Sequence, residues 1–504
     1  MDKMDEVVSL CARRGIIFPT AEIYGSFAGF FDYGDYGTEL KRSLENSWWT
    51  AFVSSREDVV GIDGAIITSP EVWKASGHLE EFNDPLVECA KCKSKFRLDH
   101  LVEEELGLSV DGMKAAELST LLEKHGLKCP KCKEGLRISQ PFNLMFKTNV
   151  GAAAGEDDAA FLRPETAQLI FADFRQVQMS SRLKLPFGIA QIGKAFRNEI
   201  SPRNFVFRCR EFVQMELEYF IHPEKMDVCA IPEALAGLEI LVLTAEMQDS
   251  KQQPQKMRIA DLLQRKLVKT KWHAYWLAYS LRWLEGVGIG LERLRLRQHV
   301  KTELSHYSSE TWDVEYFYPW GWKELLGVAN RTDFDLVRHG RQSGKDLSHF
   351  DEETKKKVVP FVIEPSFGLE RVLLTVLLDA YTEKADKDGS KTVLALRPAI
   401  APVKAAVFPL MKKDGLAEKA REIFLGLLST FAVEYDDSGS IGKRYARADE
   451  VGIPFAMTID YDTLKDGTVT LRDRDSTKQT RIRHSEAESI LLQLLRGERK
   501  FEDL

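Results

Sequence analysis

The fold is decided by the segment FGIAQIGKAFRNEISPRNFVFRCREFVQMELEYF, residues Phe187 to Phe220. Its alternation of apolar and polar positions predicts two antiparallel strands joined by the polar loop 201–204. Successive side chains of a strand point to opposite faces, so the second strand has one apolar face that packs and one polar face. The polar face carries Phe212, Gln214, Glu216 and Glu218. The hairpin therefore predicts a sheet with one surface that lines a polar site.

Arginines gather on the same hairpin. Arg197 and Glu199 share a face of the first strand, and Arg203, Arg208 and Arg210 follow in or after the loop. Guanidinium groups next to carboxylates suit a triphosphate lying beside a cationic ligand. Ordinary cross-strand ion pairs on an exposed hairpin are the alternative, and the hairpin by itself does not decide between them.

A second stretch, PFVIEPSFGLERVLLTVLLDAY (residues 360–381), predicts a buried strand, a tight turn at 365–368 and a helix. Arg371 then lies in the first helical turn, where free backbone amides already favour anions. This position suits a phosphate group. The alternative is an arginine that extends from a helix end into solvent.

Four of the seven cysteines form two C-x2-C pairs, Cys89 with Cys92 and Cys129 with Cys132. Four thiolates spaced in this way predict a closed tetrahedral zinc site, which is structural because no coordination position stays open. The alternative is four cysteines without a metal. Residues 86–140 are expected to form a small insertion around these pairs.

The composition excludes several classes of protein. The chain has 504 residues, 44% of them hydrophobic and 29% charged, with a net charge of −7. Wholesale disorder and a disulfide scaffold are excluded, no membrane span is expected, and the N-terminus carries no targeting pattern, so a cytoplasmic protein is expected. Residues 251–301 hold twelve Lys and Arg against three Asp and Glu. They make 221–300 a predicted basic helical insertion.

The aromatic residues of 271–284 recur at helical spacing: Trp272, Tyr275, Trp276, Tyr279 and Trp283. A buried seam is favoured over an RNA-stacking surface. Phosphate contacts are expected instead from Arg293, Arg295 and Arg297.

Taken together, the motifs resemble the class II aminoacyl-tRNA synthetases, and among them the dimeric glycyl-tRNA synthetase family. Residues 38–70 resemble the first class motif, which builds a dimer interface; FRNE (196–199) with REF (210–212) resembles the second, and GLER (368–371) the third. RPETAQ (163–168), QMELE (214–218) and EPSFG (364–368) are similar to motifs of the glycine family.

The resemblance implies an α+β fold with an antiparallel sheet flanked by helices. Residues 1–381 would form the catalytic domain, 382–391 a linker, and 392–504 an α/β anticodon-binding domain with basic contacts from Lys443, Arg444, Arg472 and Arg474. It implies a homodimeric ligase that joins glycine to tRNA(Gly) with ATP and Mg²⁺. A non-catalytic relative would lack Arg197, Glu199 and Arg371, and a synthetase for another amino acid would need a different side-chain pocket.

The resemblance also implies the site residues. Arg197, Glu199 and Arg371 would be catalytic, with Glu324 a candidate Mg²⁺ ligand. The full ATP set would be Arg197, Asn198, Glu199, Phe207, Arg208, Arg210, Phe212, Glu324, Leu325, Gly368 and Arg371. The glycine set would be Arg97, Glu165, Phe212, Gln214, Glu216, Glu364, Ser366 and Gly368. Three carboxylates would face the ammonium group, and Ser366 would fill the space of a methyl, so no editing site is expected.

Overall fold

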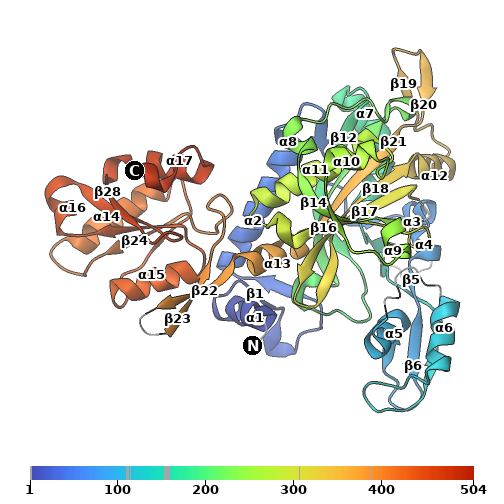
Figure 1. The fold of residues 1–504 in the computed structure, drawn as a ribbon, viewed down its shortest axis with the longest axis horizontal. Helices are drawn as coiled ribbons and strands as arrows, with labels where there is room; N and C mark the ends of the chain where they lie inside the picture. The colour runs from blue at the N-terminus through green and yellow to red at the C-terminus, as the bar shows by residue number, and fades with distance from the viewer. Residues whose placement is uncertain are drawn as a thin grey trace.

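A computed structural model describes residues 3–108, 110, 113, 115–151, 159–305, 307–386 and 389–504. Figure 1 shows a large central body, a C-terminal body beside it and a small insertion below it. Within the described part, no helix is both long enough and apolar enough to span a bilayer.

The central body is built on a nine-stranded sheet. Its order is β15(Gln255–Arg258), β14(Glu239–Leu243), β16(Leu294–Gln298), β17(Glu310–Tyr318), β18(Gly321–Thr332), β21(Phe361–Gly368), β13(Glu211–Ile221), β12(Phe187–Phe196) and β3(Val59–Gly61). Neighbouring strands are antiparallel except for β14 with β16 and β12 with β3. The predicted antiparallel sheet is confirmed.

The predicted hairpin is the pair β12–β13, in register from Phe187 with Phe220 to Phe196 with Glu211. The apolar face of β13 packs on α2(Asp35–Trp49), α11(Lys271–Gly286) and α13(Leu369–Ala380). On the opposite face, α7(Ala167–Ser181) covers only the end of the hairpin at Phe187 and Phe220. Farther along the same face, Phe212 and Gln214 line a cavity, whereas Glu216 and Glu218 are buried.

One glycine of β12 is required by a close approach. A Cβ atom on Gly193 would lie 2.1 Å from Nη2 of Arg163, far inside contact distance. Arg163 is 2% exposed and donates to the carbonyl oxygens of Lys194 and Gly64, at 2.6 and 2.7 Å. The arginine therefore fixes the loop that leads to Glu165 against the hairpin.

Two expectations about the strands of the main sheet are wrong. Residues 221–300 contribute the strands β14, β15 and β16 to the main sheet and are not only helical, because short strands in a basic, helix-rich segment carry little periodic signal. No turn occupies 365–368: β21 continues to Gly368, with Pro365 opposite Val328. Within the segment that resembles the first class motif, residues 59–70 contain two short strands, β3 and β4(Ile67–Thr68), and Pro70 opens α3(Pro70–Ser76).

The aromatic seam is confirmed as buried. Trp276 and Trp283 of α11 pack around Phe52, with ring centroids 6.1 Å away in both cases. The guanidinium of Arg56 lies over the Tyr275 and Tyr279 rings, 5.6 and 5.4 Å from their centroids. This helix face is therefore part of the core and is closed to RNA bases.

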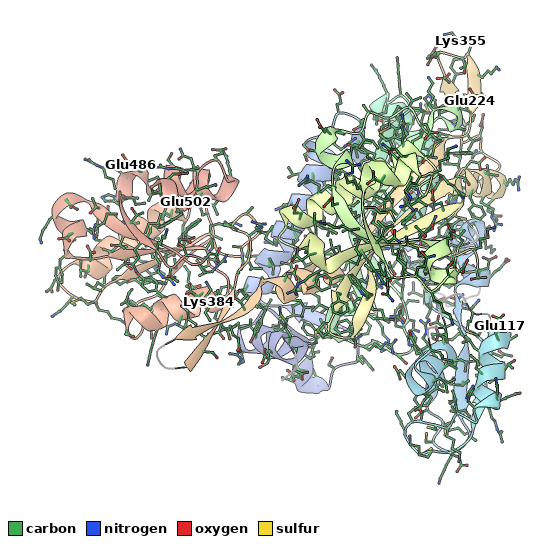
Figure 2. All side chains as sticks on the ribbon, in the orientation of Figure 1. Glu117, Glu224, Lys355, Lys384, Glu486 and Glu502 are labelled. Carbon is green, nitrogen blue, oxygen red and sulfur yellow. The ribbon has the colours of Figure 1, made fainter. Side chains whose placement is uncertain are left out.

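The insertion has its own core. It contains β6(Leu86–Cys89), β7(Lys95–Arg97), α5(Leu98–Leu106), α6(Ala115–Lys124) and β8(Leu136–Ile138). Val87, Leu98, Leu101 and Leu122 are buried together there. Glu117 marks its outer helix in Figure 2.

The C-terminal body is a five-stranded sheet with helices, as expected. It comprises β25(Val433–Tyr435), β24(Ala405–Pro409), β26(Phe455–Ile459), β27(Thr468–Asp473), β28(Gln479–Arg483), α14(Leu416–Leu427), α15(Ile441–Glu450), α16(Tyr461–Asp466) and α17(Ala487–Arg496). The expected linker is a hairpin, β22(Tyr381–Asp386) with β23(Gly389–Leu394), which carries Lys384 (Figure 2); residues 387–388 lie outside the described part.

Polar side-chain contacts join the C-terminal body to the central one. Glu450 of α15 accepts hydrogen bonds from Arg13 and Arg14, the first at 2.8 Å. The Tyr36 hydroxyl, in the first turn of α2, donates to Glu434 at 2.7 Å. In Figure 1, α2 stands between the C-terminal body and the main sheet.

The smaller described elements complete the fold. They are α1(Lys3–Arg13), β1(Ile17–Pro19), β2(Phe31–Tyr33), α4(His78–Glu81), β5(Asn83–Asp84), β9(Phe142–Asn143), β10(Phe146–Asn149), β11(Ala159–Leu162), α8(Glu233–Ala236), α9(Ala245–Asp249), α10(Ile259–Gln264), α12(Phe334–Ser343), β19(His349–Asp351) and β20(Lys356–Val358).

Candidate functional site

A cavity of about 350 Å³ lies between the β12–β13 hairpin, β18, β21, the start of α13 and the insertion. Twelve residues predicted from the sequence line it: Arg97, Arg197, Glu199, Phe207, Arg208, Phe212, Gln214, Glu324, Leu325, Ser366, Gly368 and Arg371. Segments that are more than 250 residues apart in the chain thus meet in one space.

Arg197 follows β12 and lies between two aromatic rings. Its guanidinium carbon is 5.5 Å from the centroid of Phe82 and 5.3 Å from that of Phe212, and Nε donates to the Pro164 carbonyl at 3.0 Å. The rings restrict the guanidinium to one plane while its remaining N–H groups stay available. A fixed arginine of this kind suits an anionic oxygen.

Arg371 lies opposite, in the first turn of α13. It is 3.1 Å from Oε1 of Glu324 and 4.8 Å from the centroid of the Phe207 ring. The guanidinium of Arg371 lowers the pKa of Glu324, so this carboxylate is ionised at neutral pH. The pair offers both a cation for phosphate and an oxygen ligand for a divalent metal ion.

Two predicted arginines differ in what their side chains contact. Arg208 lines the cavity, and its Nη1 lies 2.7 Å from Nε2 of His100. Burial, and then the charge of Arg97, lowers the pKa of His100 to about 3, so the neutral imidazole accepts from Arg208. Arg210 is directed away from the cavity, because it donates to the carbonyl oxygens of Glu199 and Ala28 at 2.9 Å.

Arg97 comes from the insertion and is already paired. It is 2.7 Å from Asp84 and 2.6 Å from Asp99, and 3.7 Å from Glu199. Burial raises the pKa of Asp84 to about 6, although Arg97 opposes that rise. Much of the Arg97 charge is therefore compensated before any ligand enters.

Three buried or half-buried carboxyl groups, those of Glu165, Glu216 and Glu364, lie behind Gln214 and Ser366 and are called the acidic pocket. Glu216 is 2% exposed and accepts four hydrogen bonds: from the backbone N–H of Thr166 at 3.0 Å, from the Thr166 hydroxyl, from Gln214 at 2.9 Å and from Ser366 at 2.7 Å. These four donors orient both carboxyl oxygens. Burial, and then the charge of Glu165, raises the pKa of Glu216.

Glu165 and Glu364 complete the acidic pocket. Burial alone would raise the pKa of Glu165, but His78 and Arg331 hold it well below its usual range. Burial raises the pKa of Glu364 to about 8, even though Arg331 donates to it at 3.0 Å. Arg331 is 1% exposed and also pairs with Asp335. A buried excess of acid groups makes this pocket receptive to a small cation.

Glu165, Glu216, Glu364, Asn198 and Arg210 do not line the main cavity. The sequence also missed Phe82, Asp84, His78, His100 and Arg331, which hold the predicted residues in place. No spacing pattern marks them, because each reaches the site from a separate element. Arg331 had one usable signal, an arginine inside the apolar run of β18.

The four cysteines come together as predicted. Their sulfur atoms all lie within 4.8 Å of one another, with Cys89 to Cys132 at 3.4 Å and Cys92 to Cys129 at 3.7 Å. Tetrahedral zinc with sulfur ligands requires about 3.8 Å between sulfurs. In both pairs the next residue, Lys93 or Lys133, has a left-handed φ and donates back to the first cysteine carbonyl. The donor set fits zinc.

Most of the predicted RNA-contacting arginines are occupied by protein groups. Arg295 pairs with Glu315 at 2.5 Å, and Arg293 lies 3.0 Å from Asp379. Arg297 pairs with Glu303. In the C-terminal body Arg444, Arg472 and Arg474 are at most 5% exposed and hold Pro409, Asp449 and Leu396 respectively. Of the four basic residues predicted to contact the anticodon arm, Lys443 is the one that is exposed.

Comparisons with known proteins agree on two domains. Residues 146–233 match the tRNA synthetase class II core domain (G, H, P, S and T), and residues 404–494 match an anticodon binding domain. The chain is 45% identical to the glycine–tRNA ligase of Geobacillus thermodenitrificans over 97% of each chain. It is 44% identical to that of Caldanaerobacter subterraneus subsp. tengcongensis over 98% of each chain, and 45% identical to that of Bacillus anthracis over 97% of this chain and 99% of the relative.

Proposed function

Because this chain belongs to the glycine–tRNA ligase family of class II synthetases, we propose that it activates glycine with ATP and transfers the glycyl group to the 3′ end of tRNA(Gly). One observation carries the proposal. Arg197 and Arg371 line one cavity with Ser366, and Ser366 donates to Glu216 of the acidic pocket. The arrangement suits a triphosphate and a small ammonium compound held together.

In the first step a carboxylate oxygen of glycine forms a bond to the α-phosphorus of ATP, and the bond from that phosphorus to the bridging oxygen breaks. Pyrophosphate leaves with the bond electrons, and glycyl-adenylate remains. Arg197 would neutralise the α-phosphate, and Arg371 and Arg208 the leaving phosphates. Positioning and charge neutralisation are the main contributions a protein makes to such displacements. Mg²⁺ bound with ATP would add positive charge, with Glu324 as its protein ligand.

In the second step the 3′-terminal hydroxyl of tRNA attacks the glycyl carbonyl carbon, and AMP leaves. The proton of that hydroxyl ends on the released phosphate or in solvent, so no protein nucleophile is required.

Phe212 and Phe207 line the cavity and would pack against adenine, with Leu325 beside them.

Glycine recognition would rest on charge and on exclusion. Glu165, Glu216 and Glu364 would contact the ammonium group, and Arg97 the carboxylate. Since Ser366 already holds Glu216 at 2.7 Å, a Cβ methyl would have to displace a bonded side chain. Overpacking of this kind costs about 1 to 3 kcal/mol, and no smaller amino acid exists to require editing.

We propose structural zinc at the four cysteines and a catalytic domain spanning residues 1–381, followed by an anticodon-binding domain at 392–504. The exposed Lys443 is the candidate contact to the anticodon arm. The site of action would be the cytoplasm, where the product enters translation.

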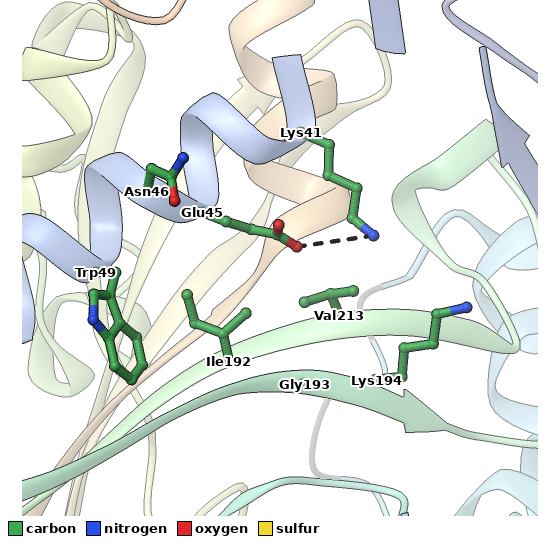
Figure 3. Close-up of a pocket in the computed structure, with 8 residues that line it drawn as sticks. All are labelled: Lys41, Glu45, Asn46, Trp49, Ile192, Gly193, Lys194 and Val213. Atoms are coloured by element: carbon green, nitrogen blue, oxygen red, sulfur yellow. Dashed lines mark ion pairs between the residues drawn. The ribbon is translucent and has the colours of Figure 1, made fainter. Parts of the chain in front are cut away.

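We propose further that the protein is a homodimer through α2. A groove of about 530 Å³ lies between α2 and the hairpin, and Lys41 and Glu45 of α2 are 3.9 Å apart in it. Figure 3 shows these two side chains on the side of Lys194 and Val213 of the hairpin. Trp49 closes one end. A half-buried groove of charged and apolar groups next to the site suits a contact with a second copy.

The test of the function is pyrophosphate exchange into ATP, measured with each amino acid in turn. Glycine is expected to stimulate exchange strongly, with alanine and serine at background. Exchange stimulated by another amino acid and not by glycine would refute the substrate. Sedimentation of the full chain tests the homodimer, and a monomer at micromolar concentration would contradict it.

A further inference from the structure

A histidine that the chemistry above does not use lies against the acidic pocket. Helices α3 and α4 meet at Gly77, whose φ of +87° favours glycine, and the turn places His78 beside Glu165. Nε2 of His78 is 3.3 Å from Oε2 of Glu165, and Nδ1 is 2.7 Å from the Ser76 hydroxyl oxygen. Both ring nitrogens therefore have a partner.

The orientation of the His78 ring is fixed by packing. Its centroid is 5.6 Å from that of Trp73 and 5.2 Å from that of Phe82, with edge-to-face geometry in both cases. The backbone carbonyl of His78 accepts from the Asn143 side chain at 3.1 Å, which fixes the turn from the other side. Neither the ring nor its backbone can rotate without breaking these contacts.

The protonation of Nε2 follows from its neighbour. An ionised carboxylate accepts hydrogen bonds and donates none, so the nitrogen that faces Glu165 carries the proton. The Ser76 hydroxyl satisfies Nδ1 as donor or as acceptor. Glu165 then receives one N–H on each oxygen, from His78 on Oε2 and from Gln168 on Oε1 at 2.9 Å. Its carboxylate plane is set from both sides.

We propose that His78 is a positioning residue for the amino-acid substrate: it orients the Glu165 carboxylate toward the ammonium group. This rests on the proposed function, in which Glu165 contacts that ammonium group. The Phe82 ring contacts both the His78 ring, at 5.2 Å between centroids, and the Arg197 guanidinium, at 5.5 Å, and no hydrogen bond joins His78 to Arg197 among the described residues. Loss of the imidazole nitrogens therefore weakens the use of glycine and leaves the use of ATP unchanged.

The experiment compares His78→Phe, which keeps an aromatic ring between Trp73 and Phe82, with His78→Gln, whose amide N–H replaces Nε2–H. Glycine-dependent pyrophosphate exchange is measured on the full chain. His78→Phe should raise the glycine KM about tenfold, because the loss of one hydrogen bond to a charged group corresponds to about that factor. The kcat and the ATP KM should stay within twofold of the wild-type values. His78→Gln should restore most of the glycine KM.

One further variant, Glu165→Gln, makes each outcome decisive. Glu165→Gln tests the pocket itself: if it raises the glycine KM and His78→Phe does not, the inference is wrong and the proposed function stands. If Glu165→Gln leaves the glycine KM unchanged, the placement of Glu165 is wrong. A rise in the ATP KM for His78→Phe equal to that for glycine would show a packing role through Phe82 and overturn the inference.

Folding is controlled separately. His349 of β19 is a buried histidine whose ring contacts the Gln178 side chain of α7. The substitution His349→Phe should leave both the glycine KM and the ATP KM unchanged. Should His78→Phe fail to fold, Ser76→Ala decides, because it removes the Nδ1 partner and keeps the ring. A rise of at least twofold in the glycine KM alone supports the inference, and no rise overturns it.

Discussion

Glu216 and Glu218 offer a matched test of the acidic pocket, because they lie two residues apart on one face of β13. Glu216 accepts four hydrogen bonds. Glu218 is fully buried, and neither of its carboxyl oxygens has a hydrogen-bond partner among the residues that the structure describes. Glu→Gln is the same chemical change at both positions. It removes an acceptor held by four donors at the first position and an acceptor without such donors at the second.

The magnitudes follow from those partners. In Glu216→Gln the new NH2 group faces two donors, so two hydrogen bonds are lost, and the ammonium group of glycine loses a charged acceptor. One hydrogen bond to a charged group contributes about 1.5 to 3 kcal/mol, which corresponds to roughly a 10- to 150-fold rise in the glycine KM. Burial, and then the charge of Glu364, raises the pKa of Glu218 well above its usual range. No hydrogen bond orients the Glu218 carboxyl group in the described part of the chain, so Glu218→Gln should change the glycine KM less than threefold.

The assay is glycine-dependent pyrophosphate exchange at saturating ATP, with thermal unfolding as the control for folding. Equal effects of the two substitutions on the glycine KM would refute the reasoning, because they would show that buried charge matters and hydrogen-bond geometry does not. An unchanged glycine KM in Glu216→Gln would remove Glu216 from the pocket.

Three other outcomes are expected. Arg197→Ala should lower glycine-dependent exchange at least about 100-fold with an unchanged melting temperature, since one preorganised donor typically contributes that much; unchanged exchange would exclude Arg197 from the chemistry. Cys129→Ser should reduce the zinc content from one per chain to near zero by elemental analysis, whereas a wild-type protein without zinc would favour bare cysteines. Burial raises the pKa of Glu364 to about 8 in the folded protein, whereas the unfolded chain already releases this proton above pH 5. The folded state therefore binds one proton more between these pH values. The free energy of unfolding of the wild type should fall as the pH rises toward 8, by up to about 1.4 kcal/mol per pH unit. Glu364→Gln should flatten that fall in thermal unfolding between pH 5 and 9, and an identical slope in both proteins would contradict it.

The hairpin and its polar face were predictable because the alternation from Phe212 to Glu218 is a local signal of period two. Arg371 was predictable for a similar reason, since the apolar run that follows it marks α13. The cysteine pairs needed only their spacing. In each case the information lies within a few residues of the chain.

What could not be predicted depends on long-range contacts. Nothing near Phe82 in the sequence indicates that its ring would lie beside Arg197, and nothing near Arg210 indicates that the Ala28 carbonyl would turn it away. Pro365 was misread as part of a turn because proline donates no ladder hydrogen bond, yet it lies within the central strand β21. The paired arginines of β16 likewise depend on acids brought in by β17 and by the loop that holds Glu303.

Helix α2 touches the C-terminal body and a helix of the central body at once. Tyr36 in its first turn is bonded to Glu434 of the C-terminal body, and its middle packs against α13, which begins two residues before Arg371. A helix of 15 residues is about 22 Å long and bends little over that length. Helix α2 therefore forms one continuous connection between the C-terminal body and the helix that carries Arg371.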